Sequence, residues 1–297
     1  MLSYEEFEIE FEKELKNRYP EKEIIRRPQY KFNGIKRGLT IMGAGDIHPT
    51  VYPKDFYELY QEYEEIELVI DAVDSAIECE KVTDFKNILL DWNRVKEHVL
   101  PFIINLEKNE SCLECNDYVF KKKLDFAHGV YVDLLDDDGN HANVNITKGM
   151  LKLWKLSEEV IFNVAARNAK YDVKPMKQVI AELTGLDCSE IDISEDNAMY
   201  VLSNETRNRG AAGILDLELL NNTAENLQSD FYILPSSIHE LIFLLDEHAP
   251  SSETLKEMVK EINQTQVRQE EFLSDNIYHY SRETQDVSIV EFDWSIL

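Results

Sequence analysis

The order of the predicted elements constrains the fold of this 297-residue chain more than any single motif does. Hairpin signals are interspersed with amphipathic helices, and a long alternation of strand, helix and strand is missing. Such alternation is typical of parallel α/β folds, because neighbouring parallel strands need a crossover connection. The sequence therefore predicts an α+β fold, with a mostly antiparallel sheet and helices packed on it.

Residues 1–98 are predicted to form an N-terminal region of helix, hairpin and further helices. Ser3 and Glu6 have the spacing of a capping box, and apolar side chains then recur every three or four residues. Two strand-like runs flank Asn33-Gly34, a favoured two-residue hairpin turn. Pro28 indicates an edge strand, because proline cannot donate to a neighbouring strand.

Residues 99–297 are predicted to form a larger α+β region, either a separate domain or part of one continuous domain. Thr147 and Ser157 are predicted helix caps, and a third helix is expected to stop at Gly185. A hairpin with acidic turn residues is expected within 124–147. The predicted helix over 252–263 has apolar residues on one face, and strands are predicted at 199–202, 210–215, 231–247, 276–280 and 287–292.

The net charge of −27 limits the classes of partner. An acidic surface repels phosphate groups, so direct binding to nucleic acid or to an anionic membrane is disfavoured. The charge either serves solubility or lets an acidic face dock onto a basic protein partner.

The expected compartment is the cytoplasm. The first residues lack the basic and apolar parts of a secretory signal, and no apolar run approaches the roughly 20 residues of a membrane span. Four cysteines do not suggest a disulfide scaffold in a chain of this length. We therefore expect a soluble cytoplasmic protein with reduced thiols.

The candidate catalytic residues are Ser236, Ser237, His239 and Glu240, which interrupt the apolar run FYILPSSIHELIFLLDE. A serine nucleophile needs a base within about 3 Å and a group that stabilises the oxyanion. Gly-x-Ser-x-Gly is absent, and the start of His-Glu-x-x-His fails because residue 243 is phenylalanine. A hydrolase would also need distant groups such as Asp275 or His279, and the simpler interpretation is a kink between two strands.

Two other patterns are candidates for a binding site. Arg207 and Arg209 precede small residues and could bind an anion such as a nucleotide, although an exposed loop is the simpler interpretation. Cys112 and Cys115 have the spacing of a metal half-site or a redox pair, but no second pair of ligands follows. We therefore predict no metal site and no cofactor.

Several stretches carry a family resemblance, among them YILPSSIHE and LSDNIYHY. With DIHPTVYPKDFYELYQEYEE, MYVLSNETRNRGAAGILD and LKEMVKEINQTQV, they resemble a bacterial family known as domain of unknown function 5688. The resemblance runs from the first helix to about Thr284 and implies a single architecture over that length. It also implies an association with mobile genetic elements in anaerobic gut bacteria, and it carries over no activity and no catalytic residues.

The leading hypothesis from the sequence is a non-enzymatic, acidic interaction protein. It would act as an accessory or counter-defence factor that binds a basic protein partner. The alternative is a hydrolase with a site around Ser236, Ser237, His239 and Glu240.

Overall fold

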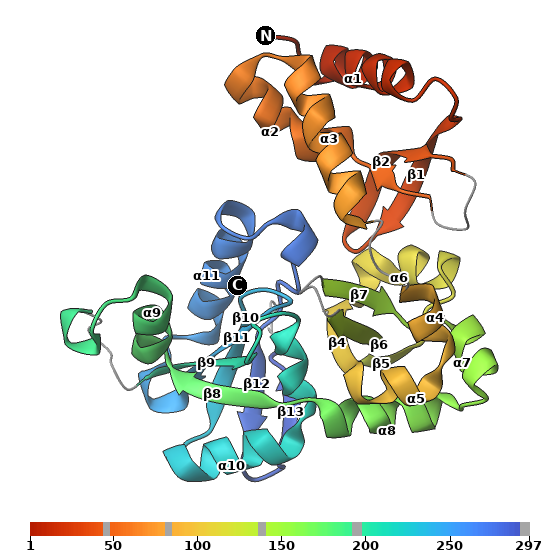
Figure 1. Ribbon diagram of the computed structural model, residues 1–297. Coiled ribbons are helices and arrows are strands. Elements are labelled where there is room, and N and C mark those ends of the chain that lie inside the picture. The colour runs from red at the N-terminus through yellow and green to blue at the C-terminus, as the bar shows by residue number, and fades with distance from the viewer. Residues whose placement is uncertain (44–47, 81–84, 136–140, 192–197, 292–297) are drawn as a thin grey trace. The chain divides into compact units, whose positions relative to one another are not determined.

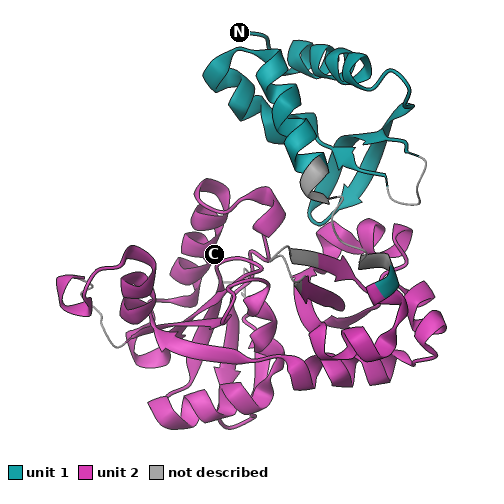
Figure 2. Ribbon diagram, in the orientation of Figure 1, with its two compact units in different colours: residues 1–87 teal, residues 88–297 magenta. Residues whose placement is uncertain are grey.

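The computed structural model describes residues 1–43, 48–80, 85–135, 141–191 and 198–291 (Figure 1). Runs of helices and runs of strands follow one another along the chain, and every pairing between described strands is antiparallel. The predicted α+β class is therefore confirmed. The chain divides into two compact units, residues 1–87 and 88–297 (Figure 2).

The first unit packs three helices against a three-stranded sheet. Ser3 and Glu6 form the predicted capping box at the start of the first helix. Phe7 and Phe11 of that helix are fully buried and share a core with Val73 of the third helix. The elements are α1 Tyr4–Arg18, β1 Ile24–Lys31, β2 Gly34–Ile41, β3 Thr50–Val51, α2 Pro53–Tyr63 and α3 Ile66–Glu80.

The β1–β2 hairpin confirms the turn signal, with the turn one residue earlier than predicted. Lys31 pairs with Gly34, so the loop residues are Phe32 and Asn33. Asn33 takes a φ of 60°, a conformation that asparagine adopts more readily than most residues. The strand order β1-β2-β3 makes β1 an edge strand, as Pro28 indicated.

The second unit begins with short helices and a four-stranded sheet. In that sheet β6 lies between β4 and β5 and also pairs with β7. Thr147 and Ser157 cap the two helices that follow, as predicted. The first of the short helices, α4 Phe85–Leu90, spans the boundary between the two units. The elements after it are α5 Trp92–Val95, η1 Lys96–His98, β4 Val99–Asn105, α6 Leu106–Cys115, β5 Phe120–Lys123, β6 Phe126–Leu135, β7 His141–Asn145, α7 Lys148–Trp154 and α8 Glu158–Asn168.

A six-stranded sheet in the order β13-β12-β10-β11-β9-β8 forms the rest of the second unit. No helix in the described part of the chain is long and apolar enough to cross a membrane. The elements are β8 Tyr171–Pro175, α9 Met176–Thr184, η2 Cys188–Glu190, β9 Met199–Asn204, η3 Gly210–Leu215, α10 Leu217–Leu227, β10 Phe231–Pro235, β11 Leu241–Leu245, η4 Asp246–His248, α11 Ser252–Thr265, η5 Gln269–Glu271, β12 Tyr278–Ser281 and β13 Asp286–Ile289.

An aromatic stack holds the centre of the six-stranded sheet. The ring of Phe231 stacks on Phe243 at 4.5 Å between centroids and on Tyr280 at 5.2 Å. Because successive strand residues face opposite sides, these rings share one face, which α10 and η3 cover. The other face packs against Leu255 and Val259 of α11. The sheet is therefore a central layer between helices.

One predicted strand is wrong: residues 210–215 form the short 3₁₀ helix η3. Its small side chains are buried, so the backbone lies close to neighbouring segments. A Cβ atom on Gly210 would lie 2.5 Å from Oγ of Ser203 and 2.6 Å from the carbonyl oxygen of His239. The small residues thus reflect close packing against β9 and the β10–β11 turn, a tertiary constraint that mimics a buried strand in the sequence.

Candidate functional site

The four predicted catalytic residues lie in the connection between β10 and β11. Oγ of Ser237 accepts a hydrogen bond of 3.0 Å from the backbone N–H of His239. The N–H of Ser237 donates to the carbonyl oxygen of Glu240 at 3.2 Å. Serine commonly shapes tight turns through such bonds to nearby backbone. The predicted kink between two strands at Pro235, Ser236 and Ser237 is therefore confirmed.

The ring nitrogens of His239 contact residues other than these serines. Its Nδ1 atom accepts a hydrogen bond of 3.1 Å from the backbone N–H of Arg209, and its Nε2 atom lies 3.8 Å from a carboxylate oxygen of Glu271. Burial lowers the pKa of His239, and the charge of Arg209 adds to that effect, while Glu271 opposes it. Each ring nitrogen therefore has a partner other than a serine, an arrangement that favours a role in positioning the turn.

Arg209 is enclosed by aromatic rings, although an exposed loop was the simpler expectation. The guanidinium carbon lies 4.3 Å from the ring centroid of Tyr131 and 5.1 Å from that of Phe102. Nη1 donates to Oδ1 of Asn145 at 2.8 Å, and burial lowers the pKa of the guanidinium. Because these partners belong to β4, β6 and β7, Arg209 joins the four-stranded sheet to the loop after β9.

Arg207 has a different environment from Arg209. Its Nη2 lies 3.2 Å from a carboxylate oxygen of Glu182 in α9, and Lys174 binds the same carboxylate at 3.1 Å. These side chains line a hollow of about 380 Å³ beside β8 and β9. The two arginines therefore do not converge on one anion, and Arg207 forms an ion-pair network with α9.

Asp275 and His279 lie in separate surroundings. Oδ1 of Asp275 accepts a hydrogen bond of 2.8 Å from Asn263 in α11. Asp275 lines a polar hollow of about 770 Å³, together with Lys108, Asp125 and residues at the start of α6. His279 instead projects from β12 toward the turn after β11. The structure therefore places neither of them with the serines of the β10–β11 connection.

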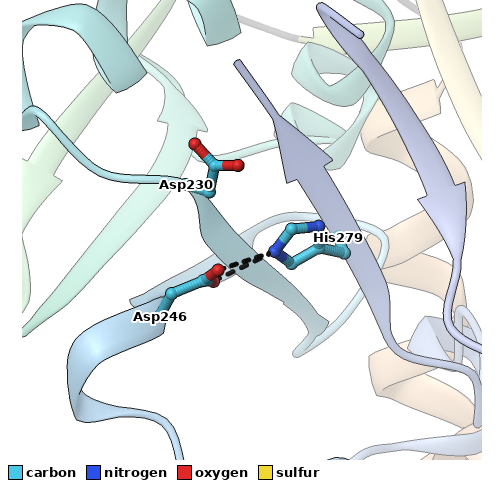
Figure 3. Close-up of side chains that lie close together, drawn as sticks. All are labelled: Asp230, Asp246 and His279. Carbon is cyan, nitrogen blue, oxygen red and sulfur yellow. Dashed lines mark hydrogen bonds and ion pairs between the residues drawn. The ribbon is translucent and has the colours of Figure 1, made fainter. Parts of the chain in front are cut away.

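Asp230, Asp246 and His279 bring three potential metal ligands together (Figure 3). One ligand atom from each residue lies within 4.8 Å of the other two. Among the described residues, these three form the one group of at least three potential ligands that lie this close together. Nε2 of His279 lies 3.0 Å from both carboxylate oxygens of Asp246. Asp230 accepts a hydrogen bond of 2.9 Å from Nε of Arg282.

The sequence analysis named His279 and missed both aspartates. The three residues belong to no short motif, because Asp246 and His279 are 33 positions apart. A weak signal was available: Asp230 directly precedes β10 and Asp246 directly follows β11, and the ends of these strands pair through Phe231 and Leu245. The prediction that the protein has no metal site stays a prediction.

The chain matches the model of a family of unknown function (DUF5688) over residues 4–282. Because this match covers most of the chain, the protein belongs to that family, in agreement with the resemblance of its sequence segments. Comparisons with curated proteins and with solved structures found no match.

Proposed function

We propose that this protein is a non-enzymatic interaction protein that binds a basic protein partner through an acidic surface of its second unit. In residues 88–297 acidic side chains outnumber basic ones by two to one. The expected place of action is the cytoplasm, and the same charge disfavours nucleic acid as a ligand.

Carboxylates at one end of the six-stranded sheet carry the proposal. Asp230 precedes β10, Asp246 follows β11 and Asp286 begins β13, and strand pairing joins these ends through β12. Burial raises the pKa of Tyr232, and the charges of Asp246 and Glu253 raise it further. The pKa of Tyr280 is raised first by burial and then by nearby carboxylates, including Asp230. We call this surface the acidic end, and its members are Glu225, Asp230, Asp246, Glu253 and Asp286.

Two members of the acidic end pair with cations among the described residues. Arg282 binds Asp230, and Lys123 lies 3.7 Å from Asp286, whose side chain is 54 % exposed. Glu225 and Glu253 are exposed. Exposed carboxylates of this density attract lysine and arginine side chains and steer a basic partner into contact. Because the attraction acts through solvent, it should weaken as salt rises.

Affinity capture from a bacterial lysate at low and moderate salt tests the proposal. The bait is the full chain, compared with the variant Glu225→Gln, Glu253→Gln and Asp286→Asn, which neutralises three exposed members of the acidic end. We expect a basic protein to be enriched by the wild type at low salt, and to be reduced both by added salt and by the variant.

A matched control neutralises three exposed carboxylates outside the acidic end: Glu97→Gln, Glu114→Gln and Glu159→Gln. The control has the same net charge as the test variant, so it separates the location of charge from its amount. Equal capture by the test variant and the wild type, or capture of no basic protein at either salt concentration, would contradict the proposal.

The alternative function, a hydrolase around Ser236, Ser237, His239 and Glu240, gains no support from the contacts of His239. Its ring nitrogens face Arg209 and Glu271, and Ser237 is bonded to backbone of its own turn. The interaction role is therefore the first proposal, and labelling with a serine-reactive probe tests the hydrolase alternative.

A further inference from the structure

Strand pairing brings Asp230, Asp246 and His279 to one place. The backbone N–H of Asp246 donates to the carbonyl oxygen of Asp230 at 3.2 Å, which extends the β10–β11 pairing by one step. On the other side of β10, Tyr232 pairs with His279. The three side chains therefore come from adjacent strands whose relative register is fixed by the buried aromatic stack of the sheet.

The distances suit a metal ion with small side-chain movements. Ligand atoms on opposite sides of a zinc ion lie at most about 4.2 Å apart, because each bond is about 2.1 Å long. The chosen ligand atoms of the three residues all lie within 4.8 Å of one another. The side chains are 27, 41 and 25 % exposed for Asp230, Asp246 and His279, so an ion can reach them from solvent.

Neighbouring residues hold two of these side chains in place. The ring of Tyr232 packs edge-on against the imidazole of His279, with centroids 5.0 Å apart and planes at 66°. Arg282 donates to Oδ1 of Asp230 at 2.9 Å, which holds that carboxylate in place. Hydrogen bonds to ligating carboxylates and contacts that fix a ligating imidazole are typical of protein metal sites.

We propose that Asp230, Asp246 and His279 form a binding site for a divalent transition-metal ion, with Zn²⁺ as the expected ion. An imidazole ligand favours zinc and related metals over magnesium and calcium, which prefer oxygen ligands alone. Three protein ligands leave coordination positions for water. The proposal does not depend on the interaction role, because metal binding is measured without any protein partner.

Isothermal titration of the full chain with Zn²⁺ tests this site, using the variants Asp246→Asn and His279→Gln. Asparagine keeps the shape of the aspartate and removes its charge. Because Asp246 is exposed, we expect the Asp246→Asn variant to fold like the wild type. We expect one saturable Zn²⁺ site in the wild type that each variant weakens by at least about tenfold. Mg²⁺ is expected to bind more weakly than Zn²⁺ at this site.

The control variant His98→Gln removes an exposed histidine elsewhere in the second unit and should leave the site intact. A ¹⁵N NMR experiment on the imidazoles gives a second readout: Zn²⁺ should shift the Nε2 resonance of His279, and the acidic-end variant Glu225→Gln, Glu253→Gln and Asp286→Asn should retain this shift. Unchanged Zn²⁺ affinity in Asp246→Asn, or an unshifted His279 resonance at saturating Zn²⁺, would overturn the proposal.

Discussion

The backbone N–H of Arg209 donates a hydrogen bond of 3.1 Å to Nδ1 of His239. In a neutral imidazole this bond makes Nδ1 the acceptor and places the proton on Nε2, which faces Glu271. Burial lowers the pKa of His239 and so favours this neutral form. A histidine that looked like a catalytic base in the sequence therefore links the β10–β11 turn to the loop after β9.

A serine-reactive fluorophosphonate probe should leave Ser236 and Ser237 unlabelled. A serine is activated when a base accepts its proton, and the base expected for this role has its Nδ1 occupied by Arg209. Mass spectrometry of the treated protein would map any adduct, with a known serine hydrolase as positive control. Labelling that the substitution Ser237→Ala removes would contradict the structural role and restore the hydrolase alternative.

Replacing Arg209 by methionine should destabilise the second unit by about 2 kcal/mol. The change removes the contacts of the guanidinium with Phe102 and Tyr131 and its hydrogen bond to Asn145. Urea unfolding followed by tryptophan fluorescence would measure the loss, because all three tryptophans belong to residues 88–297.

The matched control for this experiment is Arg207→Met, which breaks an ion pair with Glu182 near the surface. Such pairs contribute about 0–1 kcal/mol to the free energy of unfolding. If both substitutions lower the free energy of unfolding by the same amount, the contacts of Arg209 do not stabilise the junction between the four-stranded sheet and the loop after β9.

Asp125→Asn should lower the free energy of unfolding by about 2–3 kcal/mol. The carboxylate accepts hydrogen bonds from Ser274 at 2.6 Å, Asn276 at 3.0 Å and Tyr278 at 2.6 Å. An amide has one acceptor oxygen and cannot replace three bonds to a charged group. Urea unfolding measures the effect, and Asp117→Asn, an exposed aspartate, is the control. A loss below 0.5 kcal/mol would refute the importance of this cluster.

The second unit should lose stability as the pH falls from about 6.5 toward 4, and His128 should account for part of the loss. Burial, with a smaller contribution from the charge of Lys121, lowers the pKa of His128 to about 4. The ordinary value of 6.5 holds in the unfolded chain, which therefore binds a proton that the folded chain excludes. The stability contributed by the neutral ring is thus present above pH 6.5 and is lost on acidification.

At pH 4.5 this difference corresponds to about 2.5 kcal/mol. Urea unfolding at pH 7 and pH 4.5 should show a smaller loss for His128→Gln than for the wild type. His98→Gln, at an exposed position, should behave as the wild type. An identical loss in all three proteins would show that His128 titrates normally in the folded state.

Most of the helices and turns of this protein could be predicted from local signals. The capping box at Ser3, the caps at Thr147 and Ser157 and the stop at Gly185 depend on residues within one turn of one another. The antiparallel class followed from the hairpins for the same reason. The prediction failed at 210–215, where small residues reflect close packing against Ser203 and His239 and not a strand.

The sequence by itself determined the family, the α+β class, the acidic character and the segment that holds Ser236 to Glu240. The tertiary structure decided which of its polar residues meet. Strand pairing brought Asp230 and Asp246 to His279, and packing paired the ring nitrogens of His239 with Arg209 and Glu271. The physical reason is range: caps and periodicity act within a few residues, whereas a site depends on the register and orientation of side chains from strands far apart in the chain.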